Sequence, residues 1–171
     1  LFKNLPDDQI AAYAGIAGIA PFLDKVQEAC FRDKRPDAHI RAVATPGGTG
    51  AVRNAVSNYT ELGDKTLIPD WHWAPYKTIA EENRRFWEIF PMFNEEGNFN
   101  IKAYEEAMLK LLEEQGRVLS VLNTPAHNPT GYSISIPEWK ELIEFYTKTA
   151  EEHPDWRIIL LLDIAYIDFA G

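Results

Sequence analysis

Short apolar runs alternate with segments of helical periodicity from residue 39 onward. The apolar runs are expected to form strands at 39–44, 65–69, 87–93, 118–122 and 158–162. The intervening segments are expected to form helices at 51–62, 101–115 and 135–150. Strands that alternate with helices favour a mainly parallel sheet with helices on both faces. The predicted fold class is therefore α/β.

Two of these helices carry the clearest sequence signals. In the first, apolar residues recur at helical spacing from Ile101 to Leu112, and Gly116 follows as a stop signal. In the second, Ser135 and Pro137 mark the start. The buried face of this second helix is predicted to consist of Trp139, Leu142, Ile143, Tyr146 and Ala150.

Composition limits the classes of partner. The chain has 171 residues, 46% of them hydrophobic, so a packed core is expected. Acidic residues outnumber basic ones 26 to 17, and a net charge of -9 argues against nucleic acid or anionic membrane as a partner. Cys30 is the single cysteine, which excludes an internal disulfide or thiolate metal cluster. We expect a cytoplasmic protein without a bound metal.

A glycine-rich segment, Thr45 to Ala51 (TPGGTGA), lies between a predicted strand and a predicted helix. Glycines let backbone N–H groups approach an anion, and a helix N-terminus adds positive potential. The segment matches neither a Walker loop nor Gly-x-Gly-x-x-Gly. Phosphate binding and a plain turn that starts a helix both remain open at this point.

Two further polar motifs follow predicted strands. Asn128 lies in His-Asn-Pro-Thr-Gly at 127–131, and Asp163 and Tyr166 lie in a motif at 163–166. In parallel sheets, ligands bind beyond the carboxyl ends of strands, where such side chains could meet them. The alternatives are ordinary turn chemistry for Asn128, a local cap for Asp163 and a buried aromatic for Tyr166. His127 has no partner at ligand spacing and is interpreted as structural.

Taken in order, these motifs resemble class I pyridoxal-phosphate (PLP) aminotransferases of the aspartate/aromatic group. Three signatures are Thr-Pro-Gly-Gly-Thr-Gly-Ala, His-Asn-Pro-Thr-Gly and Asp-x-Ala-Tyr-x-x-Phe-Ala, and a fourth similarity runs from Tyr13 to Phe22. The resemblance covers nearly the whole chain. It implies part of the large domain of PLP fold type I.

The resemblance also implies roles for individual residues. Gly48 and Thr49 would bind the cofactor phosphate, and Asp163 would pair with the protonated pyridine nitrogen. Asn128 and Tyr166 would hydrogen-bond the phenolic oxygen, with Asn128 also helping to hold the substrate carboxylate. Tyr13 would reach the phosphate of the other subunit in a homodimer.

The aromatic ring that stacks on the pyridine is ambiguous in this sequence. Spacing back from Lys77 favours Trp73, and spacing forward from Pro69 favours Trp71. We predict Trp73. The chain also departs from the aspartate enzymes, since Tyr76 and Asn123 replace their usual histidines.

The resemblance divides the chain into an N-terminal segment at 1–35, with the Tyr motif of the dimer interface, and an incomplete PLP-binding large domain at 36–171. The chain lacks an initial Met and stops just after an apolar strand, so we interpret it as a fragment. The Schiff-base lysine is expected beyond Gly171, which leaves no catalytic residue here. The isolated segment, with unpaired strand edges, is expected to rearrange, associate or bind PLP poorly.

The leading functional hypothesis is transfer of an amino group from an acidic or aromatic amino acid to a 2-oxo acid, in the full-length protein. A PLP-dependent lyase or decarboxylase of the same fold is the runner-up. A non-enzymatic regulator with an aminotransferase-like domain is a third hypothesis. The last is an unrelated nucleotide-binding domain, for which Asp70 would be a weak candidate for the ribose-binding acid.

Overall fold

The computed structural model describes residues 6–170, and its chain divides into two compact units, Leu1–Pro46 and Gly47–Gly171. The boundary falls after Pro46, whereas the sequence placed it after residue 35. Residues 1–5 and 171, at the outer ends of the two predicted segments, lie outside the described residues. The roles assigned to the two segments stay predictions.

The first unit contains two helices, α1 (Asp7–Ala11) and α2 (Ala20–Phe31). The turn between them contains Gly18, whose φ is +115°. A Cβ at Gly18 would lie 2.8 Å from the Cβ of Ala44, so a side chain does not fit. The Ala44 N–H donates to the carbonyl of Ala17 over 2.7 Å. Glycine at position 18 therefore permits the close approach of these two segments.

The segment 39–44 is irregular in the structure, so the strand predicted there is wrong. A strand requires a neighbour that exchanges backbone hydrogen bonds with it. The hydrogen bond from Ala44 goes to a turn, and the four strands of the described chain pair with one another. The apolar run at 39–44 has no strand alongside it within residues 6–170.

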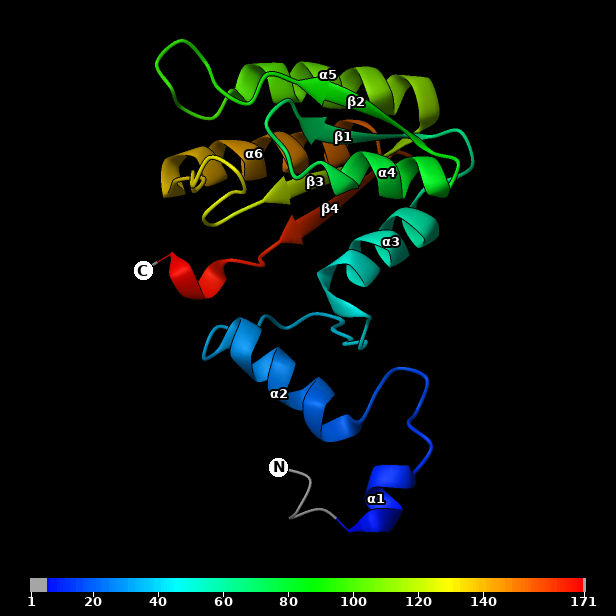
Figure 1. Ribbon diagram of the computed structural model, residues 1–171. Coiled ribbons are helices and arrows are strands. Elements are labelled where there is room, and N and C mark those ends of the chain that lie inside the picture. The colour runs from blue at the N-terminus through cyan, green and yellow to red at the C-terminus, as the bar shows by residue number, and fades with distance from the viewer. Residues whose placement is uncertain (1–5, 171) are drawn as a thin grey trace. The chain divides into compact units, whose positions relative to one another are not determined.

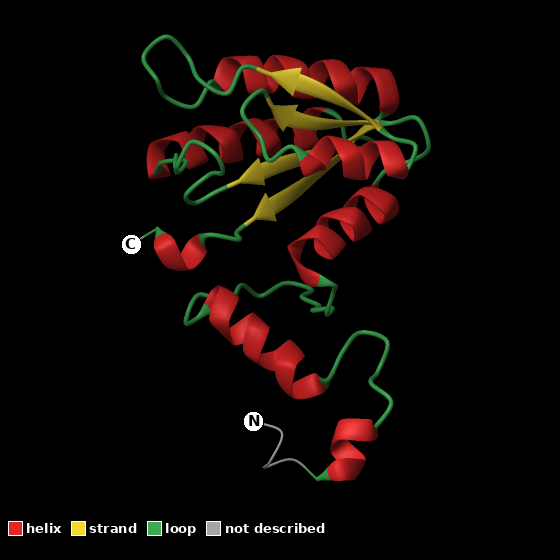
Figure 2. Cartoon of the chain, viewed as in Figure 1, coloured by secondary structure: helices red, strands yellow, loops and turns green. Residues whose placement is uncertain are grey.

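The second unit is built on a sheet of four parallel strands in the order β2-β1-β3-β4. They are β1 (Lys65–Pro69), β2 (Phe86–Phe90), β3 (Arg117–Asn123) and β4 (Arg157–Asp163). Figure 2 shows all four arrows pointing the same way. The helices are α3 (Gly47–Tyr59), α4 (Pro75–Glu82), α5 (Ile101–Gln115) and α6 (Ile136–Glu152), followed by the short 3₁₀ helix η2 (Ile167–Phe169). The α/β prediction is confirmed.

Chain direction explains how the helices divide between the two faces of the sheet. The step from β1 to β2 runs opposite to the steps from β2 to β3 and from β3 to β4. Since parallel crossovers are right-handed, opposite directions place the connecting helices on opposite faces. Accordingly α4 packs with α3 on one face, and α5 and α6 cover the other (Figure 1).

Side chains alternate between two apolar layers. The layer under α5 and α6 contains Leu67, Phe90, Val118 and Leu122 from the strands. The layer under α3 and α4 contains Ile68, Leu119 and Val121. Tyr104, Met108, Leu111 and Leu112 of α5 are fully buried, as their helical spacing predicts. The central strands β1 and β3 are therefore covered on both sides.

The ends of α5 and α6 follow their sequence signals. Gly116 adopts a left-handed conformation (φ 71°) and caps α5. Ser135 and Glu138 form a reciprocal capping box at the start of α6. These two predictions of helix limits are confirmed.

The predicted buried face of α6 is only partly correct. Leu142 is fully buried, but Ile143 is 56% exposed and Ala150 is also exposed. The observed inward stripe runs through Leu142, Phe145, Tyr146 and Thr149, which follow the i, i+3, i+4, i+7 spacing of one helix face. Ile143 and Ala150 are each one position beyond this stripe, which turns them about 100° away from the core.

Strand β2 ends at Phe90, three residues earlier than predicted. Pro91 follows directly and has no N–H to continue the ladder. Phe93 instead forms an isolated antiparallel bridge with Phe99, across the loop that leads to α5.

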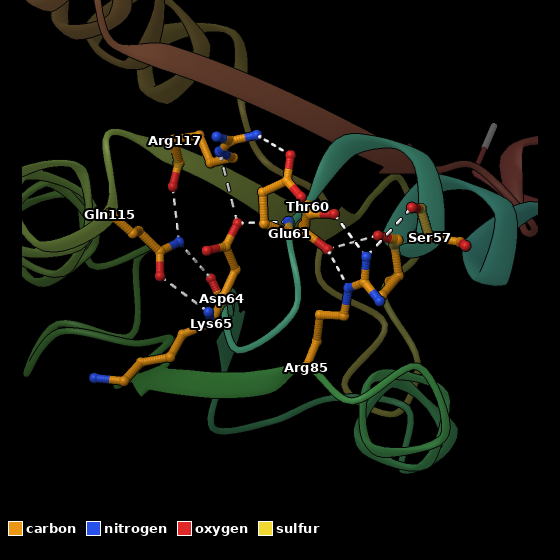
Figure 3. A network of polar contacts seen from close by, with 9 residues as sticks. Ser57, Thr60, Glu61, Asp64, Lys65, Arg85, Gln115 and Arg117 are labelled. Atoms are coloured by element: carbon orange, nitrogen blue, oxygen red, sulfur yellow. Dashed lines mark hydrogen bonds and ion pairs between the residues drawn. The ribbon is translucent and has the colours of Figure 1, made fainter.

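Polar contacts tie together the amino ends of the strands (Figure 3). The buried Arg85 guanidinium donates to the hydroxyl and carbonyl oxygens of Thr60 and to the Asn83 carbonyl. Beside it, Arg117 at the start of β3 pairs with Glu61 (3.0 Å) and lies 3.7 Å from Asp64. The ends of α3 and α4 are thereby fixed at the edge opposite the carboxyl ends of the strands.

Candidate functional site

The carboxyl ends of β3 and β4 border a cavity of about 250 Å³. The connections from β1 and from β2 lead to opposite sides of the sheet, so the strand order reverses between β1 and β3. In open α/β sheets, ligands bind beyond the carboxyl ends of the strands near such a point. The residues that line the cavity are Gly48, Thr49, Trp73, Asn123, Asn128, Asp163, Ala165 and Tyr166.

Six of the seven residues predicted to bind a cofactor lie around this one cavity: Gly48, Thr49, Trp73, Asn128, Asp163 and Tyr166. These six residues come from separate segments between Gly48 and Tyr166, and only the fold brings the segments together. Tyr13 belongs to the other unit, where its side chain is 94% exposed. The binding roles of all seven residues remain predictions.

The glycine-rich segment forms the first turn of α3, which begins at Gly47 rather than near Ala51. Gly48 and Thr49 thus stand where backbone N–H groups have no carbonyl of their own helix to bind. A Cβ built on Gly48 would have no protein atom within 4 Å. The protein itself leaves room for a side chain there, and Gly48 is one of the residues that line the cavity. The turn is suited to hold an anion.

The Asp163 carboxylate receives two hydrogen bonds from different parts of the unit. Tyr76 Oη donates to Oδ2 over 2.5 Å, and the Ala165 N–H donates to Oδ1 over 3.1 Å. Burial, and then the bond to Asp163, raises the pKa of Tyr76, so this phenol stays protonated and remains a donor. Among residues 6–170 no ion pair neutralises Asp163.

Asn123 connects the two strand ends to the loop that carries Asn128. Its Nδ2 donates to the Asp163 carbonyl (2.7 Å), and its Oδ1 accepts from the Asn128 N–H (2.6 Å). Asn128 Nδ2 in turn donates to Tyr166 Oη over 3.2 Å. This chain of bonds fixes the polar wall of the cavity.

Tyr76 and Asn123 were noted in the sequence only as departures from the aspartate enzymes. A signal for Asn123 was available, because a polar residue ends an otherwise apolar, buried strand. For Tyr76 the signal was weaker, since its contact with Asp163 joins residues 87 positions apart.

The structure distinguishes the two tryptophans. Trp73 lines the cavity and packs edge-on against Tyr76, with 5.5 Å between ring centroids and an interplanar angle of 84°. Trp71 is 54% exposed and does not belong to the cavity lining. Because Trp73 lines the cavity and Trp71 does not, Trp73 is favoured as the ring that faces a ligand.

His127 is buried beside the cavity, with 2% of its surface exposed. Its Nδ1 lies 2.8 Å from the Thr130 hydroxyl oxygen, within the turn that follows Asn128. Burial lowers the pKa of His127, so the imidazole is neutral near pH 7. In the described part of the chain, no three His, Cys, Asp or Glu side chains are placed to hold a metal ion.

Asp70 takes part in a loop rather than in the cavity. Its Oδ1 accepts from the backbone N–H groups of Trp71 and Met92, both over 2.8 Å. These bonds join the loops that follow β1 and β2. The hypothesis of an unrelated nucleotide-binding domain therefore loses its candidate for the ribose-binding acid.

None of the helices within residues 6–170 has the length and apolar character needed to cross a membrane.

Solved structures share this fold. An aminotransferase from Anaerococcus prevotii superposes with a TM-score of 0.93 and 40% identity, over 99% of this chain and 41% of that one. An aromatic-amino-acid aminotransferase from Burkholderia pseudomallei, covalently bound to pyridoxal phosphate, gives a TM-score of 0.69 at 22% identity. The match covers 94% of this chain and 38% of that one. These similarities agree with the predicted fold type.

Curated relatives include enzymes with different substrates. A tyrosine aminotransferase of Rhizobium meliloti is 27% identical, over 92% of this chain and 39% of that protein. An aspartate aminotransferase of Pseudomonas aeruginosa is 30% identical, over 93% of this chain and 39% of that protein. The chain thus spans about two fifths of the length of these relatives. The family described as aminotransferase class I and II matches residues 3–171, and the chain belongs to this family.

Proposed function

We propose that this chain supplies much of the pyridoxal-phosphate site of a complete aminotransferase. The observation that carries the proposal is the single cavity that joins the first turn of α3 to Asp163. A phosphate and a ring nitrogen lie at opposite ends of this cofactor, so its site needs an anion-binding turn and a carboxylate around one space. A helix N-terminal turn and a carboxylate both line this cavity, which supports the proposal.

Charge and donors around the cavity fit this cofactor. Gly48 and Thr49 offer backbone N–H groups at a helix N-terminus, and Thr49 adds a hydroxyl, which suits a phosphate. A half-buried carboxylate without a cationic partner favours a positively charged group, and Asp163 has no such partner among the described residues. A protonated pyridine nitrogen meets that need.

The remaining residues would orient the cofactor ring. Asn128 and Tyr166, already hydrogen-bonded to each other, would donate to its phenolic oxygen. Trp73 would cover one face of the ring. When bound, pyridoxal phosphate supplies a sink for the electrons released when a bond at the substrate Cα breaks. Asp163 supports that chemistry by keeping a proton on the ring nitrogen.

The complete protein would transfer an amino group from an acidic or aromatic amino acid to a 2-oxo acid. The tyrosine and aspartate aminotransferases among the relatives support this range of substrates. No lysine belongs to the described cavity lining, so the residue that moves the substrate proton is expected outside this chain. We further propose a cytoplasmic homodimer in which Tyr13 reaches the phosphate of the partner's cofactor.

The test is reconstitution of the complete protein with pyridoxal phosphate, followed by assays with glutamate, aspartate, tyrosine and phenylalanine. We expect conversion of more than one equivalent of amino donor per cofactor only when a 2-oxo acid acceptor is present, because without it the amino group stays on the cofactor. The Asp163→Asn variant should lose at least tenfold in cofactor affinity, a change of about 1.4 kcal/mol. Trp73→Ala should weaken binding, whereas Trp71→Ala is the matched control and should not.

Other outcomes would identify the alternatives. Release of CO₂ or cleavage of the substrate without a new amino acid would replace transamination with lyase or decarboxylase chemistry. Tight cofactor binding without turnover of any amino acid would favour a regulatory protein. Failure of the wild-type protein to bind pyridoxal phosphate would overturn the proposal.

A further inference from the structure

The contact between Tyr76 and Asp163 joins α4 to the end of β4. Tyr76 is 4% exposed and lies in the first turn of α4, within the apolar layer formed with α3. The edge-on packing against Trp73 holds its ring from the side of the cavity. A buried tyrosine hydroxyl needs a hydrogen-bond partner, and here the partner is Asp163 Oδ2.

Within residues 6–170, no side chain other than Tyr76 makes a hydrogen bond to the Asp163 carboxylate. Asn123 bonds to the backbone carbonyl of Asp163, and Ala165 contributes its backbone N–H. The Tyr76 hydroxyl and the Ala165 N–H therefore hold one carboxylate oxygen each, and Tyr76 is the side chain among these described residues that orients the carboxylate.

We infer that Tyr76 is the positioning residue of Asp163, and that its hydroxyl keeps this carboxylate oriented so that a shared proton stays on a bound ring nitrogen. The inference rests on the proposed function for the identity of the ring, whereas the hydrogen bond from Tyr76 does not depend on that function. Without this donor the carboxylate could turn away, its pairing with the ring nitrogen would weaken, and the ring would lose positive charge.

The first measurement uses the complete protein without cofactor. Aspartate carboxyl carbons are labelled with ¹³C, and the Asp163 carboxyl resonance is recorded by NMR at neutral pH. Tyr76→Phe removes the hydroxyl and keeps the ring, and should move this resonance from its wild-type position, because the carboxylate loses its side-chain donor. Tyr76→His, which places an N–H donor at this position, should restore most of the difference.

Tyr132→Phe is the matched control. Tyr132 donates to the Glu138 carboxylate over 2.5 Å, the same donor–acceptor distance, but lies outside the lining of this cavity. Loss of the Tyr132 hydroxyl should leave the Asp163 carboxyl resonance unchanged. A resonance at the same position in Tyr76→Phe and wild type would overturn the inference. If Tyr76→Phe does not fold, 3-fluorotyrosine at position 76, a stronger donor, should move the Asp163 resonance, and an unchanged position would likewise overturn the inference.

The second measurement uses pyridoxal phosphate labelled with ¹⁵N in the ring. In the wild-type protein the ¹⁵N resonance should lie at the position of a protonated pyridine, and Tyr76→Phe should shift it toward the unprotonated form. If the wild-type protein binds no cofactor, the proposed function fails, while the Asp163 resonance recorded without cofactor still decides the role of Tyr76. If the cofactor binds and its resonance is the same in both proteins, the inference fails and the proposed function stands.

Discussion

Asn123 and Asp163 are register partners at the carboxyl ends of β3 and β4, and the Asn123 amide donates to the Asp163 carbonyl over 2.7 Å. The same amide accepts from the Asn128 N–H. One side chain therefore links the parallel ladder to the loop that lines the cavity. Because Asn123 is 5% exposed, water cannot readily replace these bonds.

Replacing Asn123 with Ala should loosen the Asn128 loop. The change leaves the Asn128 N–H without a partner and removes one of two bonds to the Asp163 carbonyl, which still accepts from the Thr124 N–H. We expect a cost of roughly 1–3 kcal/mol in the free energy of unfolding. We also expect weaker binding of pyridoxal phosphate, by at least tenfold, in the complete protein. Fluorescence titration with the cofactor and urea denaturation measure the two effects.

Asn83→Ala provides the comparison for Asn123. Asn83 is similarly buried, but its amide donates to the Ile79 carbonyl at the end of α4. The Asn83→Ala variant should be less stable than wild type but should bind the cofactor with the same affinity. Equal losses of affinity in the two variants would show that Asn123 acts only through general stability.

Gly48→Ala should separate folding from binding. No protein atom lies within 4 Å of the added Cβ, and the φ of Gly48 is not positive, so the folded chain tolerates alanine. Stability should stay the same or rise by about 0.4–1 kcal/mol, because alanine restricts the unfolded chain. Cofactor affinity should fall in the complete protein, since Gly48 lines the cavity and a methyl group there would hinder close approach of a ligand to the backbone N–H groups. Ser57→Ala, at an exposed position near the other end of α3, should leave affinity unchanged.

Arg85→Met should destabilise the second unit without affecting the site. The guanidinium satisfies carbonyl groups at the ends of α3 and α4, and its loss should cost roughly 1–3 kcal/mol. Urea denaturation of the complete protein measures this cost. The adjacent Arg84 is exposed, so Arg84→Met should have little effect. A similar loss in both variants would contradict the role given to Arg85.

Glu138 should make stability depend on pH in the acidic range. Burial alone would raise the pKa of Glu138, but hydrogen bonds from Tyr132, Ser135 and Phe99 lower it overall from the ordinary value of 4.5. A lowered pKa in the folded state means that this stabilisation is complete above about pH 4.5 and is lost as the pH falls through the folded value.

The Glu138→Gln variant should therefore be less stable than wild type at pH 7, and the difference should shrink as the pH is lowered below about 4.5. Unfolding free energies measured from pH 3 to pH 7 test this expectation. Glu141→Gln, at an exposed position one turn further along α6, should follow the wild-type curve. A constant difference between Glu138→Gln and wild type across that range would contradict the prediction.

Local signals predicted much of the fold. The limits of α5 and α6 follow from Gly116 and Ser135, because caps act within one turn of the helix. The strand at 118–122 was recognisable from its continuous apolar run, since both of its faces are buried. At 39–44 a similar run is irregular, because a strand depends on a neighbour that local sequence does not reveal.

The candidate site was predictable as a set of residues, but not as a network. Motif order identified Asp163 and Asn128, whereas the bond from Tyr76 depends on how α4 packs against the sheet. Asn123 likewise acquires its role from the parallel register that places it opposite Asp163. Such contacts are properties of the tertiary structure and leave little trace in local sequence.

Strand β4 pairs with β3 on one side only within the described chain, and its side chains are mostly half-exposed. Asp163 therefore stands at the tip of an edge strand. Ligand contact at that tip would slow the local opening of the whole strand, because neighbouring amides open in cooperative units. Hydrogen exchange along 157–163 would then report occupancy of the site from as far as the amino end of β4.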